Sequence, residues 1–527
     1  MVSEKHLGHY VYECFKKRPK DLCQVDAATG LSETNGSVLA RSVRLGRSLI
    51  KYGLVPEKDI VALSGRGHLD LLIPYYAALF NGLPLLGVDV LYKLDEIKHI
   101  LKLTAPKIAF CEPEAYDKYI QASLEIGLDI KIVTFGDGPN CMNAFIEQYP
   151  YSEPDEDFQP VSVDIDRSLI WLSSTSGSTS TFKVAAFTHR PWLNAVFEII
   201  DMNVVYENIF DNSTASKPSL NLSPINWISG ILNPIIAPLS NQYNVQTSAP
   251  VTSEHAIEII NKYKPVKAML GPSILSYILK QSNKCDFTCF DLLTLGGAKV
   301  NPELLNEIRK RIRKGAMCFE MYGQTETIGP LFYPNPNTPI GSCGSPNTKV
   351  YKIKLIDPDT SKEVKEPNVK GELWTLGRRF ECYYNDPEKT AESFSPDGWY
   401  KTGDIFYRDE HDNYYFVERS KRIIKYQSYH IAPGELENLI QSHPGVLDVS
   451  VTGIPHADDG EHAVACVVRK PGSDVTAQEI KDLVLSKLSE KKQLRGGVIF
   501  LDALPMTSNG KVMLAKLKEI ALNSIKD

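Results

Sequence analysis

The sequence predicts an α/β protein with a large N-terminal domain of helix-covered sheets, which includes a β-rich subdomain, and a small α+β C-terminal domain. The chain has 527 residues, more than a single hydrophobic core usually serves, so at least two packed units are expected. Apolar strand-like runs alternate with amphipathic helical stretches through about the first four hundred residues, which is typical of parallel sheets covered by helices. From Tyr351 onward, short strands separated by turn signals replace this pattern.

Apolar runs mark the expected strands of the N-terminal sheets. They lie at residues 60–64, 107–111, 130–134 and 169–173. The most apolar long stretch, residues 71–91, is interrupted by Asn81, Gly82, Pro84 and Asp89. We therefore expect a buried helix followed by a strand at this position, and no transmembrane segment.

The remainder of the chain should form two smaller parts. Residues 351–412 carry turn signals such as Asp357-Pro358 and Asp412-Asn413 between short alternating strands, which predicts the β-rich subdomain. After Arg419 the pattern mixes strands and helices over roughly one hundred residues, the size of a small domain. We expect domains at residues 1–418 and 422–527, with the boundary near Lys421.

Composition and charge exclude several classes of protein. Hydrophobic residues make up 43% of the chain and charged residues 23%, close to globular averages, so a disordered or fibrous protein is not expected. The net charge of -6 offers no basic excess for nucleic acid. We expect a cytoplasmic protein, since the first ten residues lack the apolar core of a secretory signal and the chain does not end in Ser-Lys-Leu. Its ten scattered cysteines should be reduced thiols.

One basic run is expected to be the end of a helix rather than an anion-binding patch. Asn301 is a good N-cap, Pro302 suits the first helical position, and Gly315 can terminate the helix. The cations fall late in this helix, where they complement its dipole. They are Arg309, Lys310, Arg311, Arg313 and Lys314.

The strongest chemical signal lies in residues 168–189, SLIWLSSTSGSTSTFKVAAFTH, where an apolar strand enters a Ser/Thr/Gly loop. Small hydroxyl residues and Gly177 let backbone N–H groups approach a polyphosphate, and Lys183 can add a charge-assisted bond. The segment lacks the Gly-Lys-Ser string of the common P-loop. On its own, it could also be a Ser/Thr-rich linker.

Two further segments carry polar residues suited to a nucleotide. In residues 317–329, MCFEMYGQTETIG, Tyr322 offers a flat face for a purine, Thr325 a hydroxyl for phosphate, and Glu326 an oxygen ligand for Mg²⁺. In residues 398–404, GWYKTGD, Gly403 should give a tight turn, and the carboxylate of Asp404 could accept hydrogen bonds from both ribose hydroxyls.

Lysines beside glycine or proline recur in residues 417–437, VERSKRIIKYQSYHIAPGELE, and 504–512, LPMTSNGKV. The five segments, in this order and spacing, resemble the adenylate-forming superfamily of acyl-CoA synthetases, peptide-synthetase adenylation domains and beetle luciferases. The phrases IIKYQSYHIAPGELE and KKQLRGGVIFLDALP are most similar to beetle luciferases and coumarate:CoA ligases. The resemblance covers essentially the whole chain.

The resemblance implies a role for each candidate residue. The residues implied to hold the β- and γ-phosphates of ATP are Thr175, Ser176, Gly177, Ser178, Thr179 and Lys183. Those implied to flank the adenine are Gly297, Ala298, Tyr322 and Gly323. Thr325 would contact the α-phosphate, and Asp404 and Arg419 would bind the ribose. Glu326 would hold Mg²⁺. The residues implied to contact the acid are Asn226, Trp227, Gly296 and Thr327.

The implied reaction has two halves. A carboxylic acid is activated by ATP to an acyl-AMP, with Lys511 as the adenylation lysine. The small C-terminal lid then rotates about Lys421 and presents Lys425 for the second half-reaction. Three readings stay open: a carboxylate:CoA ligase acting on a fatty or aromatic acid, a luciferase-like oxygenase that uses O2, and a nucleotide-binding pseudoenzyme.

Some residues depart from the family pattern. Ser180 and Val184 stand where the phosphate loop usually has glycine, and both are expected to be strained if those glycines adopt positive φ. Relatives usually have histidine or an aromatic residue after the proline of the acyl pocket, whereas this chain reads Pro224, Ile225, Asn226, Trp227, so a beetle-type luciferin is not expected. Ser428 replaces a glycine on the face implied in thiolation.

Overall fold

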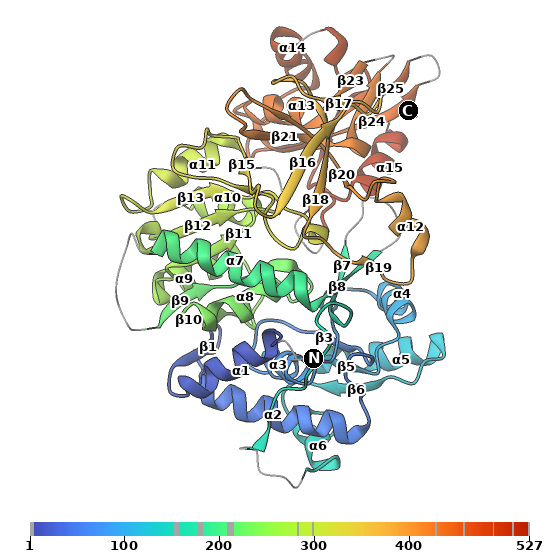
Figure 1. Ribbon diagram of the computed structural model, residues 1–527. Helices are drawn as coiled ribbons and strands as arrows, with labels where there is room; N and C mark the ends of the chain where they lie inside the picture. The colour runs from blue at the N-terminus through green and yellow to red at the C-terminus, as the bar shows by residue number, and fades with distance from the viewer. Residues whose placement is uncertain are drawn as a thin grey trace. The chain divides into compact units, whose positions relative to one another are not determined.

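The computed structural model describes residues 5–151, 157–175, 183–207, 216–281, 284–297, 300–426, 429–456, 459–488, 490–507 and 511–524 (Figure 1). These residues form two compact units. The first contains the described residues up to Leu331 together with Arg378–Glu392. The second contains Phe332–Gly377 and the described residues from Ser393 on. The expected boundary near Lys421 lies within the second unit and stays a prediction, while Lys421 itself is in the short 3-10 helix η5 (Ser420–Arg422).

The first unit contains a sheet with the strand order β19-β8-β7-β4-β3-β5-β6. Its strands from β7 to β6 are parallel, and β8 and β19 continue it antiparallel. The strand bounds are β3 (Val61–Ser64), β4 (Leu85–Gly87), β5 (Ile108–Cys111), β6 (Lys131–Thr134), β7 (Leu169–Thr175), β8 (Lys183–Thr188) and β19 (Cys382–Tyr383). The four runs expected as strands are thus confirmed.

The interrupted apolar stretch folds as expected. Helix α3 (Leu72–Phe80) is buried along its whole length and is followed by β4. It packs on β3 and β4 and against α2 (Asn35–Tyr52) (Figure 1). Among the described residues, no helix is both long and apolar enough to cross a membrane.

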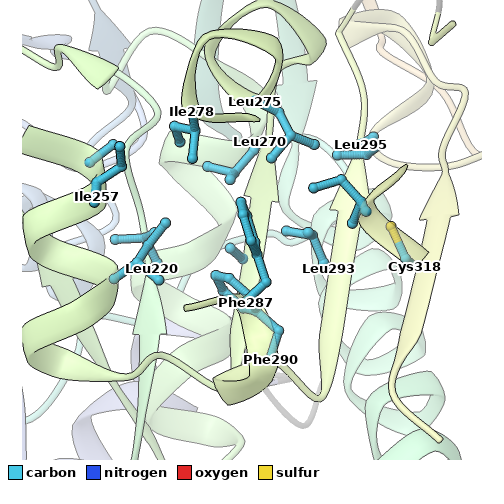
Figure 2. Close-up of a cluster of buried hydrophobic side chains, with 14 of the residues drawn as sticks. Leu220, Ile257, Leu270, Leu275, Ile278, Phe287, Phe290, Leu293, Leu295 and Cys318 are labelled. Atoms are coloured by element: carbon cyan, nitrogen blue, oxygen red, sulfur yellow. The ribbon is translucent and has the colours of Figure 1, made fainter. Parts of the chain in front are cut away.

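A second sheet of the first unit has the order β13-β12-β11-β9-β10-β1-β2, parallel except at β2. Its strands are β1 (Leu22–Asp26), β2 (Ser32–Thr34), β9 (Lys217–Leu220), β10 (Gln242–Gln246), β11 (Lys267–Leu270), β12 (Leu292–Leu295) and β13 (Met317–Glu320). Figure 2 shows the core on one part of this sheet, where strand side chains meet α9 (Ser253–Tyr263) and α10 (Pro272–Lys280). The labelled core residues are Leu220, Ile257, Leu270, Leu275, Ile278, Phe287, Phe290, Leu293, Leu295 and Cys318. Burying each large apolar side chain contributes about 1.5–3 kcal/mol to stability.

The second unit is built on two further sheets. The antiparallel sheet β17-β16-β18-β20-β21 confirms the predicted β-rich region. Its strands are β16 (Tyr351–Ile356), β17 (Glu363–Val364), β18 (Gly371–Gly377), β20 (Tyr400–Arg408) and β21 (Tyr414–Arg419). The C-terminal sheet has the order β23-β22-β25-β24, with β26 parallel to β25. Its strands are β22 (Ile424–Tyr426), β23 (Tyr429–Ile431), β24 (Val446–His456), β25 (Gly460–Arg469) and β26 (Gly497–Leu501).

The remaining helices surround these sheets. In the first unit they are α1 (Leu7–Lys17), α4 (Leu94–Thr104), α5 (Tyr116–Ile126), α6 (Met142–Gln148), α7 (His189–Glu207), α8 (Ile228–Leu239), α11 (Pro302–Arg309) and α12 (Pro387–Glu392). In the second unit they are α13 (Pro433–Gln441), α14 (Ala477–Lys487) and α15 (Leu514–Ser524). The short strands β14 (Phe332–Tyr333) and β15 (Ser345–Pro346) pair with each other.

The basic run after Asn301 corrects one expected boundary. The Asn301 side chain caps α11 as predicted, accepting from the Glu303 N–H at 2.8 Å, but the helix ends at Arg309 and not near Gly315. Arg309 donates to the carbonyl of Cys318, and Arg313 forms an ion pair with Asp291, so these two cations fix the chain against neighbouring strands. The helix therefore ends before the charge run is complete.

Gly403 does not form the expected tight turn. It lies inside β20 with φ +69°, where the pairing with β18 shifts register between Glu372 and Trp374. A positive φ in a strand is a glycine position, and extra residues in one strand produce a bulge. The Gly403 N–H donates to Oε1 of Glu372 at 3.1 Å, which satisfies a donor that the bulge removes from the ladder. Each of the ten cysteines is unbridged, as expected.

Candidate active site

The two ends of the predicted phosphate loop lie side by side. Thr175 ends β7 and Lys183 begins β8, and the two residues are antiparallel partners. The candidates between them, Ser176, Gly177, Ser178 and Thr179, lie outside the described residues, as does Ser180. The apolar strand that was predicted to lead into the phosphate loop is therefore β7, and β8 begins where the candidate loop ends.

Val184 is unstrained, which corrects the expectation of strain at this position. It lies in β8 opposite Ser174, has no positive φ, and is fully buried. Its carbonyl accepts a 2.7 Å hydrogen bond from the Tyr384 N–H. Valine is a favourable residue in a buried strand, so no glycine is needed here.

Glu326 and Lys183 converge on one tyrosine. Glu326 lies in the 3-10 helix η4 (Thr325–Thr327), and its Oε1 accepts a 2.8 Å hydrogen bond from the Tyr383 hydroxyl. The Nζ of Lys183 lies 4.5 Å from the centroid of the Tyr383 ring. Tyr383 is held in place because β19 pairs with β8. A cation at this distance is attracted by the face of the ring.

The carboxylate of Glu326 fits the role of a magnesium ligand. Among the described residues Tyr383 occupies Oε1, and no hydrogen bond is formed by Oε2. Magnesium is usually held by one or two carboxylates together with phosphate oxygens and water. A nearly buried carboxylate with one oxygen oriented by a neutral donor is suited to this task, because the donor fixes its position without neutralising its charge.

The loop around Glu326 is held by local contacts. A Cβ added to Gly323 would lie 2.5 Å from the carbonyl oxygen of Gly329, so only glycine fits this close approach. The fully buried Thr327 hydroxyl donates to the carbonyls of Gln324 at 3.0 Å and Gly329 at 3.1 Å. Thr327 was expected to contact the acid, and that role stays a prediction for a residue that is fully buried here. The Tyr322 carbonyl accepts from the Leu331 N–H at 3.1 Å.

Two candidate groups for adenine and acid meet at Gly297. Its φ is +86°, and a Cβ added there would lie 3.9 Å from Cζ3 of Trp227. At Gly296 an added Cβ would lie 2.9 Å from Cε of Met269 and 3.1 Å from the carbonyl of Met321. The glycines thus let the chain pass close to its neighbours beside the Trp227 indole. Ala298 lies outside the described residues.

Asn226 is held against the end of the first sheet. Its carbonyl accepts from the Ser173 hydroxyl at 3.1 Å, and its Nδ2 lies 3.5 Å from Oδ2 of Asp89. A Cβ at Gly87 would lie 2.7 Å from Cα of Asn226, so the glycine permits this packing. Asn226 is buried, and the structure describes no hydrogen bond to its Oδ1.

Asp404 and Arg419 of the second unit lie opposite each other. They are direct partners in the β20–β21 ladder, and Nε of Arg419 is 3.4 Å from Oδ1 of Asp404. The Asp404 side chain is only 3% exposed, whereas that of Arg419 is 47% exposed. A buried carboxylate beside an accessible guanidinium is suited to hydroxyl groups and phosphate respectively.

The two candidate catalytic lysines lie on different elements of the second unit. Lys425 is exposed on β22, and its backbone N–H donates to Oε2 of Glu461 at 3.1 Å. Lys511 precedes α15, and its backbone exchanges hydrogen bonds with Thr507 over 3.1 and 2.7 Å. The turn and the strand therefore fix the two backbones independently. Ser428 lies outside the described residues.

Sequence reasoning missed Tyr383 and Asp89 as members of this site. Tyr383 is 57 positions from Glu326 and follows no turn or glycine signal, so nothing local marks it. Asp89 did give a signal, since a carboxylate interrupts an otherwise apolar stretch. Asp89 is buried, accepts from the Leu91 N–H at 2.9 Å, and lies beside the candidate residue Asn226.

Known proteins match nearly the whole length of the chain. Residues 13–384 match the family described as AMP-binding enzyme, and residues 435–511 match the AMP-binding enzyme C-terminal domain. A luciferin 4-monooxygenase of Nipponoluciola cruciata is 30% identical over 511 residues, which cover 94% of this chain and 90% of that protein. The probable 4-coumarate–CoA ligase 3 of Dictyostelium discoideum is 25% identical over 544 residues, covering 98% and 96%. ATP-bound MatB from Rhodopseudomonas palustris has a TM-score of 0.85 at 23% identity, with 98% and 99% covered.

Proposed function

The chain belongs to the AMP-binding enzyme family of adenylate-forming enzymes, and on this premise we propose that it activates a carboxylic acid with ATP and transfers the acyl group to coenzyme A. In the first half-reaction a carboxylate oxygen attacks the α-phosphorus, the bond to the β-phosphate oxygen breaks, and pyrophosphate leaves. The product is an acyl-AMP. In the second half-reaction a thiolate attacks the acyl carbon and AMP leaves.

The arrangement of Glu326, Tyr383 and Lys183 carries this proposal. It supplies a carboxylate for magnesium and a cation near the end of the phosphate loop, both organised by one tyrosine. Magnesium bound to Glu326 would withdraw charge from the departing pyrophosphate. Lys183 would hold the terminal phosphates by a charge-assisted bond.

Lys511 and Lys425 are proposed to act in different half-reactions. Attack of a carboxylate on the α-phosphorus brings two anions together, and a lysine bridging their oxygens would stabilise the developing charge. We assign this role to Lys511. Lys425 would serve the second half-reaction after the C-terminal lid rotates, and such lid exchange would also keep water from the reactive anhydride.

The acid is proposed to carry an apolar acyl group, either fatty or aromatic. The Trp227 indole beside Gly297 offers a flat apolar wall. The Asn226 side chain adds a neutral polar group; its Nδ2 lies beside Asp89, while its backbone carbonyl accepts from the Ser173 hydroxyl. The absence of histidine in these two positions supports a substrate other than a beetle-type luciferin.

A luciferase-like oxygenase is the second candidate, and the 30% identity to a luciferin 4-monooxygenase supports it. In that case the acyl-AMP loses a proton beside its carbonyl and the carbanion reacts with O2. The coumarate:CoA ligase relative supports the thiol acceptor instead. The first half-reaction is the same in both candidates, so they differ only in what consumes the adenylate.

Mass-spectrometric product analysis distinguishes these candidates. The protein would be incubated with MgATP and a panel of fatty and aromatic acids, with and without coenzyme A, and with Lys511→Ala as control. Acyl-CoA formed only by the wild type is the expected result. Acyl-AMP that ignores coenzyme A, accompanied by oxygen consumption or light, would favour the oxygenase. Absence of any adenylate across the panel, with no binding of MgATP, would contradict adenylation.

A further inference from the structure

The hairpin between β24 and β25 brings two imidazoles together. His462 lies opposite Ile454 in this ladder, and His456 lies opposite Gly460. Residues two apart on a strand share a face, so His456 and His462 are diagonal neighbours on one side of the hairpin. Their rings stack, with centroids 3.9 Å apart and an interplanar angle of 17°.

Asp459 adds a carboxylate between the two histidines. Its Oδ2 lies 2.7 Å from Nε2 of His462 and 3.5 Å from Nδ1 of His456. One ligand atom from each of the three side chains can lie within 4.8 Å of the others. The side chains are 41%, 22% and 15% exposed for His456, Asp459 and His462, so an ion could reach them from solvent.

We infer that His456, Asp459 and His462 form a binding site for a divalent transition-metal ion, with Zn²⁺ as the preferred occupant. Imidazole nitrogens and a carboxylate oxygen are common zinc ligands at about 2.0–2.2 Å. Ligand atoms around a tetrahedral ion at this bond length are about 3.4 Å apart. The pair at 3.5 Å fits this spacing once Nδ1 of His456 gives up the 3.3 Å hydrogen bond that it accepts from the Asp459 N–H. The 2.7 Å pair fits after a small side-chain rotation that replaces the hydrogen bond by two metal bonds.

The ligand types of this site favour zinc over the magnesium ion that accompanies ATP. Magnesium prefers oxygen ligands and keeps several waters, whereas imidazole favours zinc, copper and nickel. Three protein ligands leave a fourth position that a water molecule would fill. The site therefore binds zinc in the presence of excess Mg²⁺.

The proposed site adjoins the strand that carries Lys425. Gly460 pairs with Tyr426 of β22, and Glu461 accepts from the Lys425 N–H. The Tyr426 ring also lies 5.8 Å from that of His462. An ion bound between β24 and β25 thus fixes the hairpin end against which β22 is paired. The proposed zinc site does not depend on whether the chain forms an adenylate, so zinc binding can be measured without an assay of enzyme activity.

Zinc titration of the chelator-treated protein in excess Mg²⁺ tests the site. Isothermal calorimetry should give one Zn²⁺ per chain, and Co²⁺ should give the visible absorption of a four-coordinate ion with nitrogen ligands. His456→Gln and His462→Gln should each weaken Zn²⁺ binding at least tenfold. His411→Gln, which removes an exposed histidine from another turn, should leave the affinity unchanged.

The half-exposed His456 keeps the test valid if His462→Gln folds poorly. Zn²⁺ should also raise the melting temperature of the wild type and of His411→Gln, but not that of His456→Gln. Equal zinc affinity in the wild type and His456→Gln would overturn the proposal. So would a wild-type protein that binds no Zn²⁺ at concentrations well above that of the protein.

Discussion

The hydroxyl of Tyr383 donates a 2.8 Å hydrogen bond to Oε1 of Glu326. This bond joins the short strand β19 to η4, and it orients a carboxylate that is almost enclosed by protein. The same tyrosine presents its ring to Lys183. One side chain therefore positions the proposed magnesium ligand through its polar end and the proposed phosphate cation through its face.

Tyr383→Phe should weaken the magnesium-dependent step without removing the ring. A hydrogen bond to a charged group contributes about 1.5–3 kcal/mol, so we expect a roughly 10- to 100-fold loss in pyrophosphate release at low Mg²⁺. Raising the Mg²⁺ concentration should recover part of the rate. Tyr384→Phe is the matched control, because it removes the neighbouring hydroxyl, and it should retain the wild-type rate. Equal Mg²⁺ dependence in both variants would refute the role of Tyr383.

Val184→Gly should destabilise the protein rather than improve ATP binding. The variant empties a fully buried strand position and adds backbone freedom to the unfolded chain. We expect a loss of about 2–4 kcal/mol in the free energy of unfolding, measured by urea denaturation. Val184→Ala should lose less. If Val184→Gly instead bound MgATP more tightly than the wild type and kept the same free energy of unfolding, valine would be the strained residue at this position.

The contrast between Gly403 and Val184 shows where sequence reasoning succeeded and where it failed. The parallel strands and the buried helix at residues 72–80 follow from apolar runs and breaks that are local in sequence. The polar candidates of η4 were proposed because they lie a few residues after a strand, β13. Gly403 was mistaken for a turn because its bulge exists only in the register with β18. Val184 was mistaken for a strained residue because strand pairing with β7 was not visible locally.

The Tyr383–Glu326 contact could not be predicted for a related reason. β19 reaches the site only because it pairs with β8, which is far from it in sequence. The order of strands in a sheet is a tertiary property, and no periodicity of the residues around Tyr383 encodes it. The same holds for Asn226 and Asp89, which meet where β4 and β7 lie side by side.

Lys511→Ala and Lys425→Ala should separate the two half-reactions. Lys511→Ala removes the lysine that bridges the two anions, and electrostatic stabilisation of this kind contributes about 2.7–4 kcal/mol. The variant should therefore release pyrophosphate at least 100-fold more slowly than the wild type. The variant should still convert supplied acyl-AMP to acyl-CoA. Lys425→Ala should show the reverse pattern. If Lys511→Ala also fails to use acyl-AMP, the two lysines do not divide the reaction in this way.

Three histidines of the first unit lie together, and two of them, His6 and His189, are buried. The ring centroid of His6 lies 4.4 Å from that of His9 and 5.1 Å from that of His189. The Nδ1 of His6 accepts from the Gly8 N–H at 3.0 Å, so Nε2 carries the proton and donates to the carbonyl of Val161 at 2.7 Å. Both bonds suit a neutral ring. Burial lowers the pKa of His6 to about 4 and that of His189 to about 3.

These lowered pKa values predict a loss of stability in mild acid. In the unfolded chain each ring titrates near 6.5, so the unfolded state binds the proton first, and stability falls as the pH decreases below 6.5 until the folded pKa is reached. From pH 7.5 to 5 the loss should be about 2 kcal/mol for each of His6 and His189. Urea unfolding at both pH values measures it. His6→Asn keeps a side chain that can cap α1 but removes the titrating ring, so the pH dependence of its stability should be smaller than that of the wild type by about 2 kcal/mol. A wild-type and a His6→Asn protein with the same pH dependence would show that the His6 ring is protonated in the folded state at pH 5.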